Sequence, residues 1–65
     1  MEIGQKVKVQ AYGGEVITRV IVDEIGDTVY LSQEREYDEA KRDGREPNSV
    51  GFNKRFIVDY LPIGE

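Results

Sequence analysis

The sequence predicts a mainly β fold, a small barrel of about five strands with one helix inserted between the third and fourth strands, over about residues 33–43. Apolar and polar residues alternate from Lys6 to Leu31, with the period of two that strands require. Gly13-Gly14 and Gly26-Asp27 are turn signals that divide this stretch into two hairpins. After Leu31 the period changes, and the order of charges becomes typical of a helix.

Length and composition favour a single domain spanning residues 1–65. The chain has no Cys, so its core depends on the 38% of residues that are apolar, or on a partner subunit. No apolar run is long enough to span a membrane, and the first residues lack the features of a signal peptide. We therefore expect a cytoplasmic protein that does not enter a membrane.

The charge balance bears on the class of partner. The chain carries 13 acidic and 9 basic residues, which gives a formal net charge of −4 at pH 7. This surplus of negative charge opposes general nucleic-acid binding, which relies on Lys and Arg. His and Cys are both absent, so the most common general base and the usual zinc ligands are missing. We therefore expect no metal site and no cofactor.

The first hairpin is predicted to join residues 3–11 to residues 16–23 through a two-residue loop at Gly13-Gly14. This loop gives three cross-strand pairs on one face: Ala11 with Val16, Val9 with Thr18, and Val7 with Val20.

The second hairpin turns at Gly26-Asp27 and returns over residues 28–31. The predicted register groups the side chains into a main apolar face, with Val20, Val22, Val29 and Leu31, and an opposite face, with Ile17, Ile21 and Tyr30. The opposite face needs a cover, which is the helix, the closing strand or another chain.

The helix over residues 33–43 has Ser32 as its expected N-cap, acidic residues in its first turn and basic residues in its last. Gly44 is expected to end it. Its apolar positions are Tyr37 and Ala40, so it can cover only a narrow strip of the sheet. Three further segments complete the predicted fold: a short strand over 48–52, a tight turn at 53–55 and a closing strand over 56–61.

Several of these segments carry a family resemblance: the opening Ile3-Gly4-Gln5-Lys6-Val7-Lys8-Val9, the long second strand, the return over residues 26–31 and a last strand entered through a tight turn. Together they resemble an SH3-like small β-barrel. The chain is also similar to small uncharacterised bacterial proteins in which a charged helix precedes a Gly-Arg-Glu-Pro turn, here residues 44–47. The resemblance implies a fold and no activity, because SH3-like barrels bind peptides, nucleic acids and ribosomes, and a few are enzymes.

Two motifs could bind a small ligand, and each has a simpler structural explanation. Asp23, Glu24 and Asp27 could hold a divalent cation, but Asp is common in turns and the spacing is not that of an EF-hand. Gly13-Gly14 could cradle a phosphate, but it leads into a strand rather than a helix. We expect ordinary hairpin turns at both places.

Charged and aromatic side chains on the outward face are candidate contacts. Lys6, Lys8 and Arg19 share that face, with Lys8 opposite Arg19. They can contact an anion or nucleic acid, or be neutralised by nearby Glu residues. Tyr12 borders a turn, where a Tyr can stack on a base, clasp a peptide or fill a second layer of a small core.

Three functions follow from these candidates. The first, which we favour, is a non-catalytic binding or assembly module that contacts a protein partner, or a second copy of the chain, through Ile17, Ile21, Tyr30 and Tyr37. The alternative is a nucleic-acid-associated small barrel that uses a local basic face of Lys6, Lys8, Tyr12, Arg19, Lys54 and Arg55. The third is a small oligomeric enzyme with its site between subunits, relying on Tyr, Lys and carboxylates. We expect no enzyme.

Overall fold

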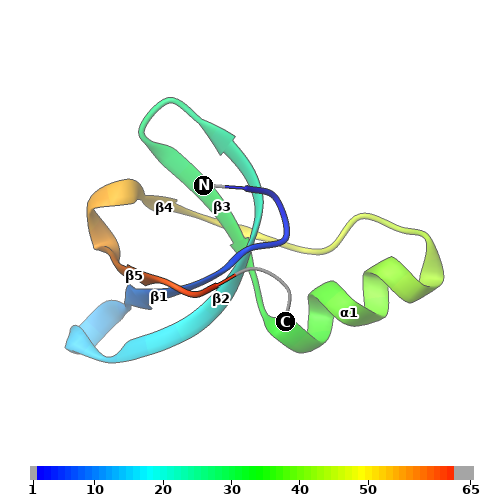
Figure 1. Ribbon diagram of the computed structural model, residues 1–65, viewed down its shortest axis with the longest axis horizontal. Coiled ribbons are helices and arrows are strands. Elements are labelled where there is room, and N and C mark those ends of the chain that lie inside the picture. The colour runs from blue at the N-terminus through cyan, green and yellow to red at the C-terminus, as the bar shows by residue number, and fades with distance from the viewer. Residues whose placement is uncertain (1, 63–65) are drawn as a thin grey trace.

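The computed structural model describes residues 2–62, which form five strands and one α-helix (Figure 1). The strands are β1 (Lys6–Gln10), β2 (Val16–Ile25), β3 (Thr28–Ser32), β4 (Val50–Asn53) and β5 (Ile57–Tyr60). The helix α1 (Glu34–Asp43) lies between β3 and β4, and two short 3-10 helices are η1 (Tyr12–Gly14) and η2 (Lys54–Phe56). The predicted mainly β class, the number of strands and the position of the helix are confirmed.

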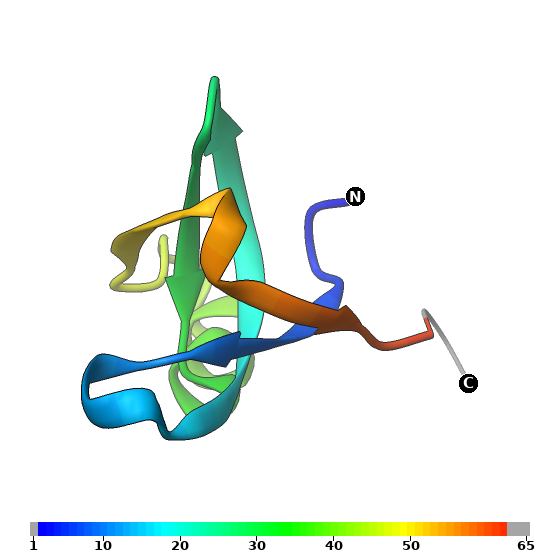
Figure 2. The same ribbon diagram turned by 90° about the vertical axis from the view of Figure 1, so that its left-hand side faces the viewer.

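All five strands form one antiparallel sheet in the order β4-β3-β2-β1-β5. The sheet is strongly curved, and η2 carries the chain from one edge strand to the other (Figure 2). The ladders among residues 2–62 join β4 only to β3 and β5 only to β1, so the sheet curves without closing into a barrel. Each edge strand therefore keeps one side without a strand partner.

The loop of the first hairpin is one residue longer than predicted. The backbone N–H of Ala11 donates to the carbonyl of Glu15 at 2.6 Å, which encloses the three residues of η1. The expectation of a two-residue loop at Gly13-Gly14 is wrong, because Tyr12 also belongs to the turn.

The longer loop shifts the pairing of β1 and β2 by one residue. Val7 lies opposite Arg19, and Val9 lies opposite Ile17. The predicted pair of Lys8 with Arg19 is wrong, since Lys8 lies opposite Thr18. A shift of one residue turns every side chain of a strand to the other face, so Ile17, Arg19 and Ile21 of β2 lie on the core side of the sheet.

The second hairpin has the predicted turn at Gly26-Asp27 but not the predicted register along its whole length. A β-bulge at Val22 shifts the pairing between Ile21 and Asp23. On the side of the bulge away from the turn, Ile21 lies opposite Leu31. The grouping of Leu31 with Val22 is therefore wrong, and Leu31 packs with Ile21.

The core lies on the inner face of β1, β2 and β3. Its members are exposed by 2% or less: Val7, Val9, Ile21, Val29 and Leu31. Three half-buried side chains pack against them at the margin: Ile17, Phe52 and Ile57. The last two strands thus contribute only to the margin of the core.

The ends of α1 largely follow the sequence. The N-cap is Gln33, one residue later than predicted, and its side chain makes no capping hydrogen bond. The acidic first turn and the basic last turn are as expected. Gly44 ends the helix with a φ of 73°, a left-handed conformation that glycine adopts most easily, and this prediction is confirmed.

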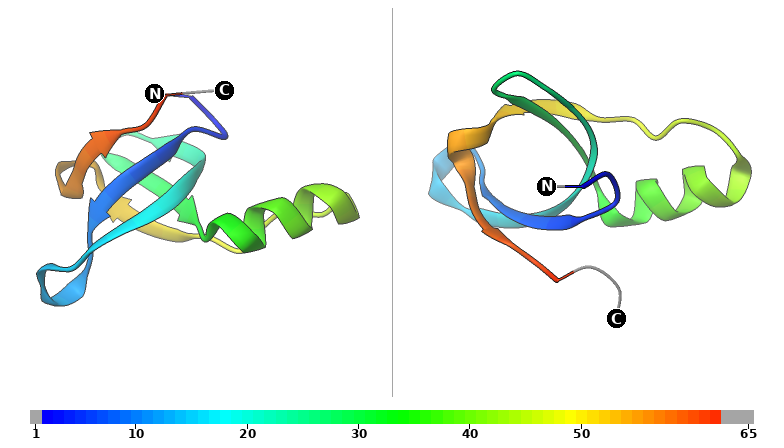
Figure 3. Two further views of the ribbon diagram at one scale, coloured as in Figure 1. Left: turned by 60° about the horizontal axis from the view of Figure 1, so that its bottom comes forward. Right: turned by 45° about the horizontal axis from the view of Figure 1, so that its top comes forward.

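The helix α1 extends beyond one end of the sheet and touches it through few residues (Figures 1 and 3). Ala40 is completely buried. A Cβ atom added to Gly4 would lie 3.1 Å from the Tyr37 hydroxyl, so Tyr37 docks on the backbone before β1. The Gly4 N–H donates to the carbonyl of Ile21 at 2.7 Å, which fixes that backbone on β2. Among residues 2–62, α1 is too short and too polar to cross a bilayer.

Candidate ligand-binding groove

Among the surface hollows of residues 2–62, three have similar volumes, so their chemistry distinguishes them better than their size. They measure about 380, 400 and 420 Å³. The first lies on the inner face of the sheet beside α1, the second lies near the Gly26-Asp27 hairpin, and the third lies between η1 and η2. Hollows of this size accommodate a few side chains of a ligand.

The hollow of about 420 Å³ is the most aromatic of the three, and we call it the aromatic hollow. Tyr12 in η1, Phe52 in β4 and Phe56 in η2 line it, together with Gln10 and Ala11. The Tyr12 side chain is fully exposed, and Phe56 is 37% exposed. Three aromatic rings that remain accessible to solvent form an apolar surface suited to a ligand.

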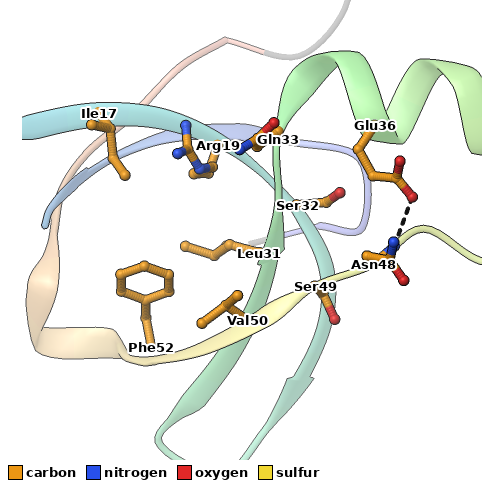
Figure 4. A pocket seen from close by; sticks show the side chains of 10 residues that line it. All are labelled: Ile17, Arg19, Leu31, Ser32, Gln33, Glu36, Asn48, Ser49, Val50 and Phe52. Atoms are coloured by element: carbon orange, nitrogen blue, oxygen red, sulfur yellow. Dashed lines mark hydrogen bonds between the residues drawn. The ribbon is translucent and has the colours of Figure 1, made fainter.

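The hollow of about 380 Å³ combines an apolar part with a polar part, and we call it the inner-face hollow (Figure 4). Its apolar lining is Ile17, Leu31, Val50 and Phe52. Its polar lining is Arg19, Ser32, Gln33, Glu36, Asn48 and Ser49. In Figure 4 the Phe52 ring lies at the end away from α1, and the Ser32 side chain points to the end where Glu36 and Asn48 lie.

Arg19 is the cation of the inner-face hollow. It lies opposite Val7 because of the shifted register, so its half-buried side chain is on the inner face of the sheet. Its guanidinium donates to the Thr18 carbonyl at 2.8 Å. Among residues 2–62 no carboxylate lies within ion-pair distance of Arg19. Its charge is therefore uncompensated by a direct contact.

Ser32 is a buried polar residue with an unsatisfied hydroxyl. It is only 2% exposed, and its Oγ has no hydrogen-bond partner among the described residues. Buried hydroxyl groups normally have a partner, because an unpaired one costs about 1–3 kcal/mol. Ser32 lies opposite Val20 in the ladder of β2 and β3, so its side chain is on the face of the sheet opposite to that of Arg19 and Leu31.

The negative charge of the inner-face hollow is already compensated. Glu36 accepts hydrogen bonds from the Arg45 guanidinium at 2.7 Å and from the Asn48 backbone N–H at 2.9 Å. These bonds hold the pKa of the Glu36 carboxyl below its usual value, the Arg45 bond having the larger effect. The same contact raises the pKa of Arg45. Glu36 therefore does not neutralise Arg19, and it ties α1 to the segment that enters β4.

The remaining hollow, of about 400 Å³, contains the half-buried Tyr30. Its other residues are Val22, Asp23, Ile25, Glu46, Pro47 and Ser49. Asp23 and Glu46 make this hollow acidic, and it has one aromatic lining residue where the aromatic hollow has three.

The four residues predicted to form one partner-binding surface do not lie together. Ile21 is completely buried in the core, so it cannot contact a partner. Ile17 lines the inner-face hollow, whereas Tyr30 lines the hollow near the hairpin. Tyr37 lies beside Gly4. The structure thus separates this set into the core and three different places.

The predicted basic face is also divided. Arg19 lies on the inner face, whereas Lys6 forms an ion pair with Glu34 at 3.1 Å and Lys8 is exposed on the other face of β1. Lys54 pairs with Glu24, and this contact raises the pKa of Lys54.

Most residues that line the inner-face hollow and the aromatic hollow had no predicted site role, among them Ser32, Phe52 and Phe56. The sequence placed Phe52 and Phe56 on either side of a tight turn at 53–55, whereas Phe56 is itself part of η2. The sequence gave no indication that Tyr12 of the other turn lies near them. Ser32 was expected to cap the helix, a role that would have satisfied its hydroxyl.

No group of three or more acidic residues that could hold a metal ion occurs within residues 2–62. Comparison of the chain with models of protein families, with curated proteins and with solved structures gave no match.

Proposed function

We propose that this protein is a non-catalytic module that binds an extended peptide segment of a partner protein, on a sheet of SH3-like arrangement. The observation that carries the proposal is the aromatic hollow, in which Tyr12, Phe52 and Phe56 are brought together from three separate elements. Exposed aromatic groups on a rigid sheet are typical of surfaces that bind peptides.

The SH3-like arrangement is supported by the strand pattern. The long curved strand β2 takes part in two hairpins, and the last strand is entered through the one-turn helix η2. These are parts of the sequence pattern that resembles SH3-like barrels.

The shape of the surface favours an extended ligand over a compact one. Phe52 lines both the aromatic hollow and the inner-face hollow, so the two adjoin along β4. We call the combined surface the groove. An extended peptide can place one apolar side chain in each hollow, and its backbone would lie near the strands.

The alternative function, nucleic-acid binding, gains no support from the arrangement of charges. The basic residues lie on opposite faces of the sheet or are paired with acidic ones, such as Lys6 with Glu34. Phosphate binding needs several cations on one face and is opposed by the net charge of −4.

An affinity selection tests the proposal. A library of random peptides displayed on phage is selected on the immobilised protein, and the enriched peptides are measured against Tyr12→Ser. We expect enrichment of apolar and aromatic peptides, whose affinity falls about tenfold in Tyr12→Ser, because an aromatic contact contributes about 0.5–1.5 kcal/mol beyond its buried area.

The matched control is Ile25→Ser, which removes a 62% exposed apolar side chain from the hollow near the hairpin. We expect it to leave peptide binding unchanged. Enriched peptides that depend on Ile25 and not on Tyr12 would contradict the proposed site, and a failure to enrich any peptide would contradict the function.

A further inference from the structure

We infer that the partner segment pairs as an added antiparallel strand with β4, along the edge that does not pair with β3, and that it carries a basic side chain between two apolar ones. This inference rests on the proposed function and names how the ligand of that function binds. It follows from the backbone groups, the side chains and the charges at this edge, which we call the β4 edge.

The β4 edge presents backbone groups without a partner. The Lys54 N–H donates to the Asp27 carbonyl at 2.8 Å, in line with the ladder of β3 and β4. The backbone groups of every second residue of an antiparallel strand point to the partner strand, so those of Phe52 point to β3 and those of Gly51 point away from it. Among residues 2–62 the N–H and the carbonyl of Gly51 have no backbone hydrogen-bond partner. A residue opposite Gly51 in an added strand would satisfy both.

The two edge strands differ in how well they exclude another strand. β5 is bulged at Val58, where the register with β1 shifts, and it contains Asp59. Bulges and charged side chains are features that keep edge strands from pairing. β4 has the sequence Val-Gly-Phe-Asn, which carries no charge, and its register with β3 is regular. The added strand is therefore assigned to β4 and not to β5.

The inner face of the sheet determines two side chains of the ligand. Side chains of an added strand alternate between the two faces, so the neighbours of the residue opposite Gly51 point to the inner face. They would lie beside Val50, which is 64% exposed, and Phe52, which lines both hollows of the groove (Figure 4). Apolar side chains suit both positions, because they would remove this apolar surface from water.

The outer face determines the side chain between them. Gly51 lies opposite Tyr30, and a Cβ atom added to Gly51 would lie 3.3 Å from a carbon of the Tyr30 ring, so the ring covers this part of β4. The residue opposite Gly51 in an added strand points to the same face. Its side chain would therefore meet the Tyr30 ring.

The charges near this ring favour a basic side chain. Tyr30 lines the hollow near the hairpin together with Asp23 and Glu46. Neither carboxylate has an ion-pair partner within residues 2–62. A Lys or Arg side chain can stack on the ring at the rim of this hollow and is attracted by the carboxylates. The net charge of −4 adds to this attraction.

A second copy of the chain is a poorer occupant of the β4 edge. Its edge strands β4 and β5, with the sequences Val-Gly-Phe-Asn and Ile-Val-Asp-Tyr, contain no basic residue to place on Tyr30. Two chains that each carry a net charge of −4 also repel each other. The occupant is therefore a segment of another protein.

The test uses the peptide acetyl-Thr-Val-Arg-Val-Thr-amide and two versions of it, each with one N-methyl group. Titration of the ¹⁵N-labelled full chain gives the affinities. Methylation of the arginine nitrogen removes the N–H that would donate to the Gly51 carbonyl, and we expect it to weaken binding about tenfold. Methylation of the following valine is the matched control, because that N–H points away from β4, and it should leave the affinity within about twofold. Saturation with the unmethylated peptide should slow amide exchange at Gly51.

Variants assign the effect to residues of the chain. Gly51→Pro removes the N–H that points to the added strand, a change that an edge strand tolerates, and it should weaken binding about tenfold. Gly51→Ala is the matched control, because it adds a Cβ atom and keeps the N–H. A peptide with norleucine in place of arginine should bind about threefold more weakly, and Tyr30→Leu should remove this difference. If Gly51→Pro does not fold, the methylated peptides test the same hydrogen bonds.

The outcomes separate this inference from the proposed function. If the N-methyl-arginine peptide binds as tightly as the parent and Gly51 exchanges at an unchanged rate, strand addition at β4 is overturned, whereas a continued dependence on Tyr12 supports the proposed function. If no peptide of this pattern binds, the inference fails, and the phage selection decides on the function independently. If exchange at Gly51 slows with rising protein concentration in the absence of peptide, the occupant is a second copy of the chain and the assignment to a partner is overturned.

Discussion

The first three strands and the last two are unequal halves of one sheet. The inner side chains of β1, β2 and β3 are exposed by 2% or less at Val7, Val9, Ile21, Val29 and Leu31. In β4 and β5 the inner residues Phe52 and Ile57 are half-buried, whereas Val50 and Val58 are 64% and 54% exposed. The first half holds the buried core, and the second half leaves apolar side chains exposed.

The physical reason for this asymmetry is size. A chain of 65 residues has too little apolar surface to cover both ends of a five-stranded sheet. The helix could have covered the second half, but its Tyr37 docks instead on the backbone before β1. The groove is therefore left open by the placement of α1.

The largest predicted effect tests the first half. Ile21→Ala should lower the free energy of unfolding by about 2–5 kcal/mol, because it leaves a cavity in the core. Ile21→Val should cost about 0.5–1.5 kcal/mol if the alanine variant does not fold. Urea denaturation followed by circular dichroism measures both.

The matched change in the second half is Val58→Ala, which we expect to alter the free energy of unfolding by less than about 0.5 kcal/mol, since the side chain is exposed. A loss as large as that of Ile21→Val would show that β5 is as well packed as β2, and the division into halves would be incorrect.

Ser32→Ala should increase stability, unlike most substitutions of buried residues. Removal of the unsatisfied hydroxyl is expected to raise the free energy of unfolding by about 1 kcal/mol. A decrease in stability would instead show that the hydroxyl has a structural partner.

Gly44→Ala tests the end of α1, which borders the open half. Because Gly44 has a φ of 73°, alanine there should lower the free energy of unfolding by about 1 kcal/mol. The thermal midpoint of the variant measures this effect. An unchanged midpoint would mean that the helix end is not coupled to the cooperative unit of the sheet.

The smallest effect concerns pH and the contact that joins α1 to β4. The folded-state pKa of Glu36 is lowered by Arg45 and Asn48, so its stabilising contribution is present above the carboxyl pKa of the unfolded chain. The contribution is lost as the pH falls through the lowered pKa of the folded state. The protection factor of the Asn48 amide, which is its exchange rate compared with the intrinsic rate at the same pH, should therefore fall in acid, and Glu36→Gln should remove this pH dependence. Equal pH dependence in the variant would exclude Glu36 as its source.

Local chemistry made part of this structure predictable. The Gly26-Asp27 turn, the charge order of α1 and the end of the helix at Gly44 depend on neighbouring residues, and all three are as predicted. Arg35 and Glu39, four residues apart in α1, form an ion pair at 3.2 Å. Each of these features depends on residues within one turn of a chain, where residue preferences are most informative.

The candidate site was less predictable because it depends on register. Both faces of β2 carry apolar residues, since Ile17 and Ile21 alternate with Val20 and Val22. The alternation therefore allowed either face to be buried. A two-residue loop at Gly13-Gly14 was the simplest interpretation, and it placed Arg19 outside.

The sequence by itself determined that this chain forms a mainly β sheet of five strands with a helix before the fourth, because turns, period and charge order are local properties. Only the tertiary structure decided which face of β2 lies inside, since a one-residue shift preserves the alternation and exchanges the faces. The third loop residue in η1 and the bulge at Val22 made that choice. They buried Ile21, turned Arg19 toward the groove, and made the groove a site with both a charge and an apolar wall.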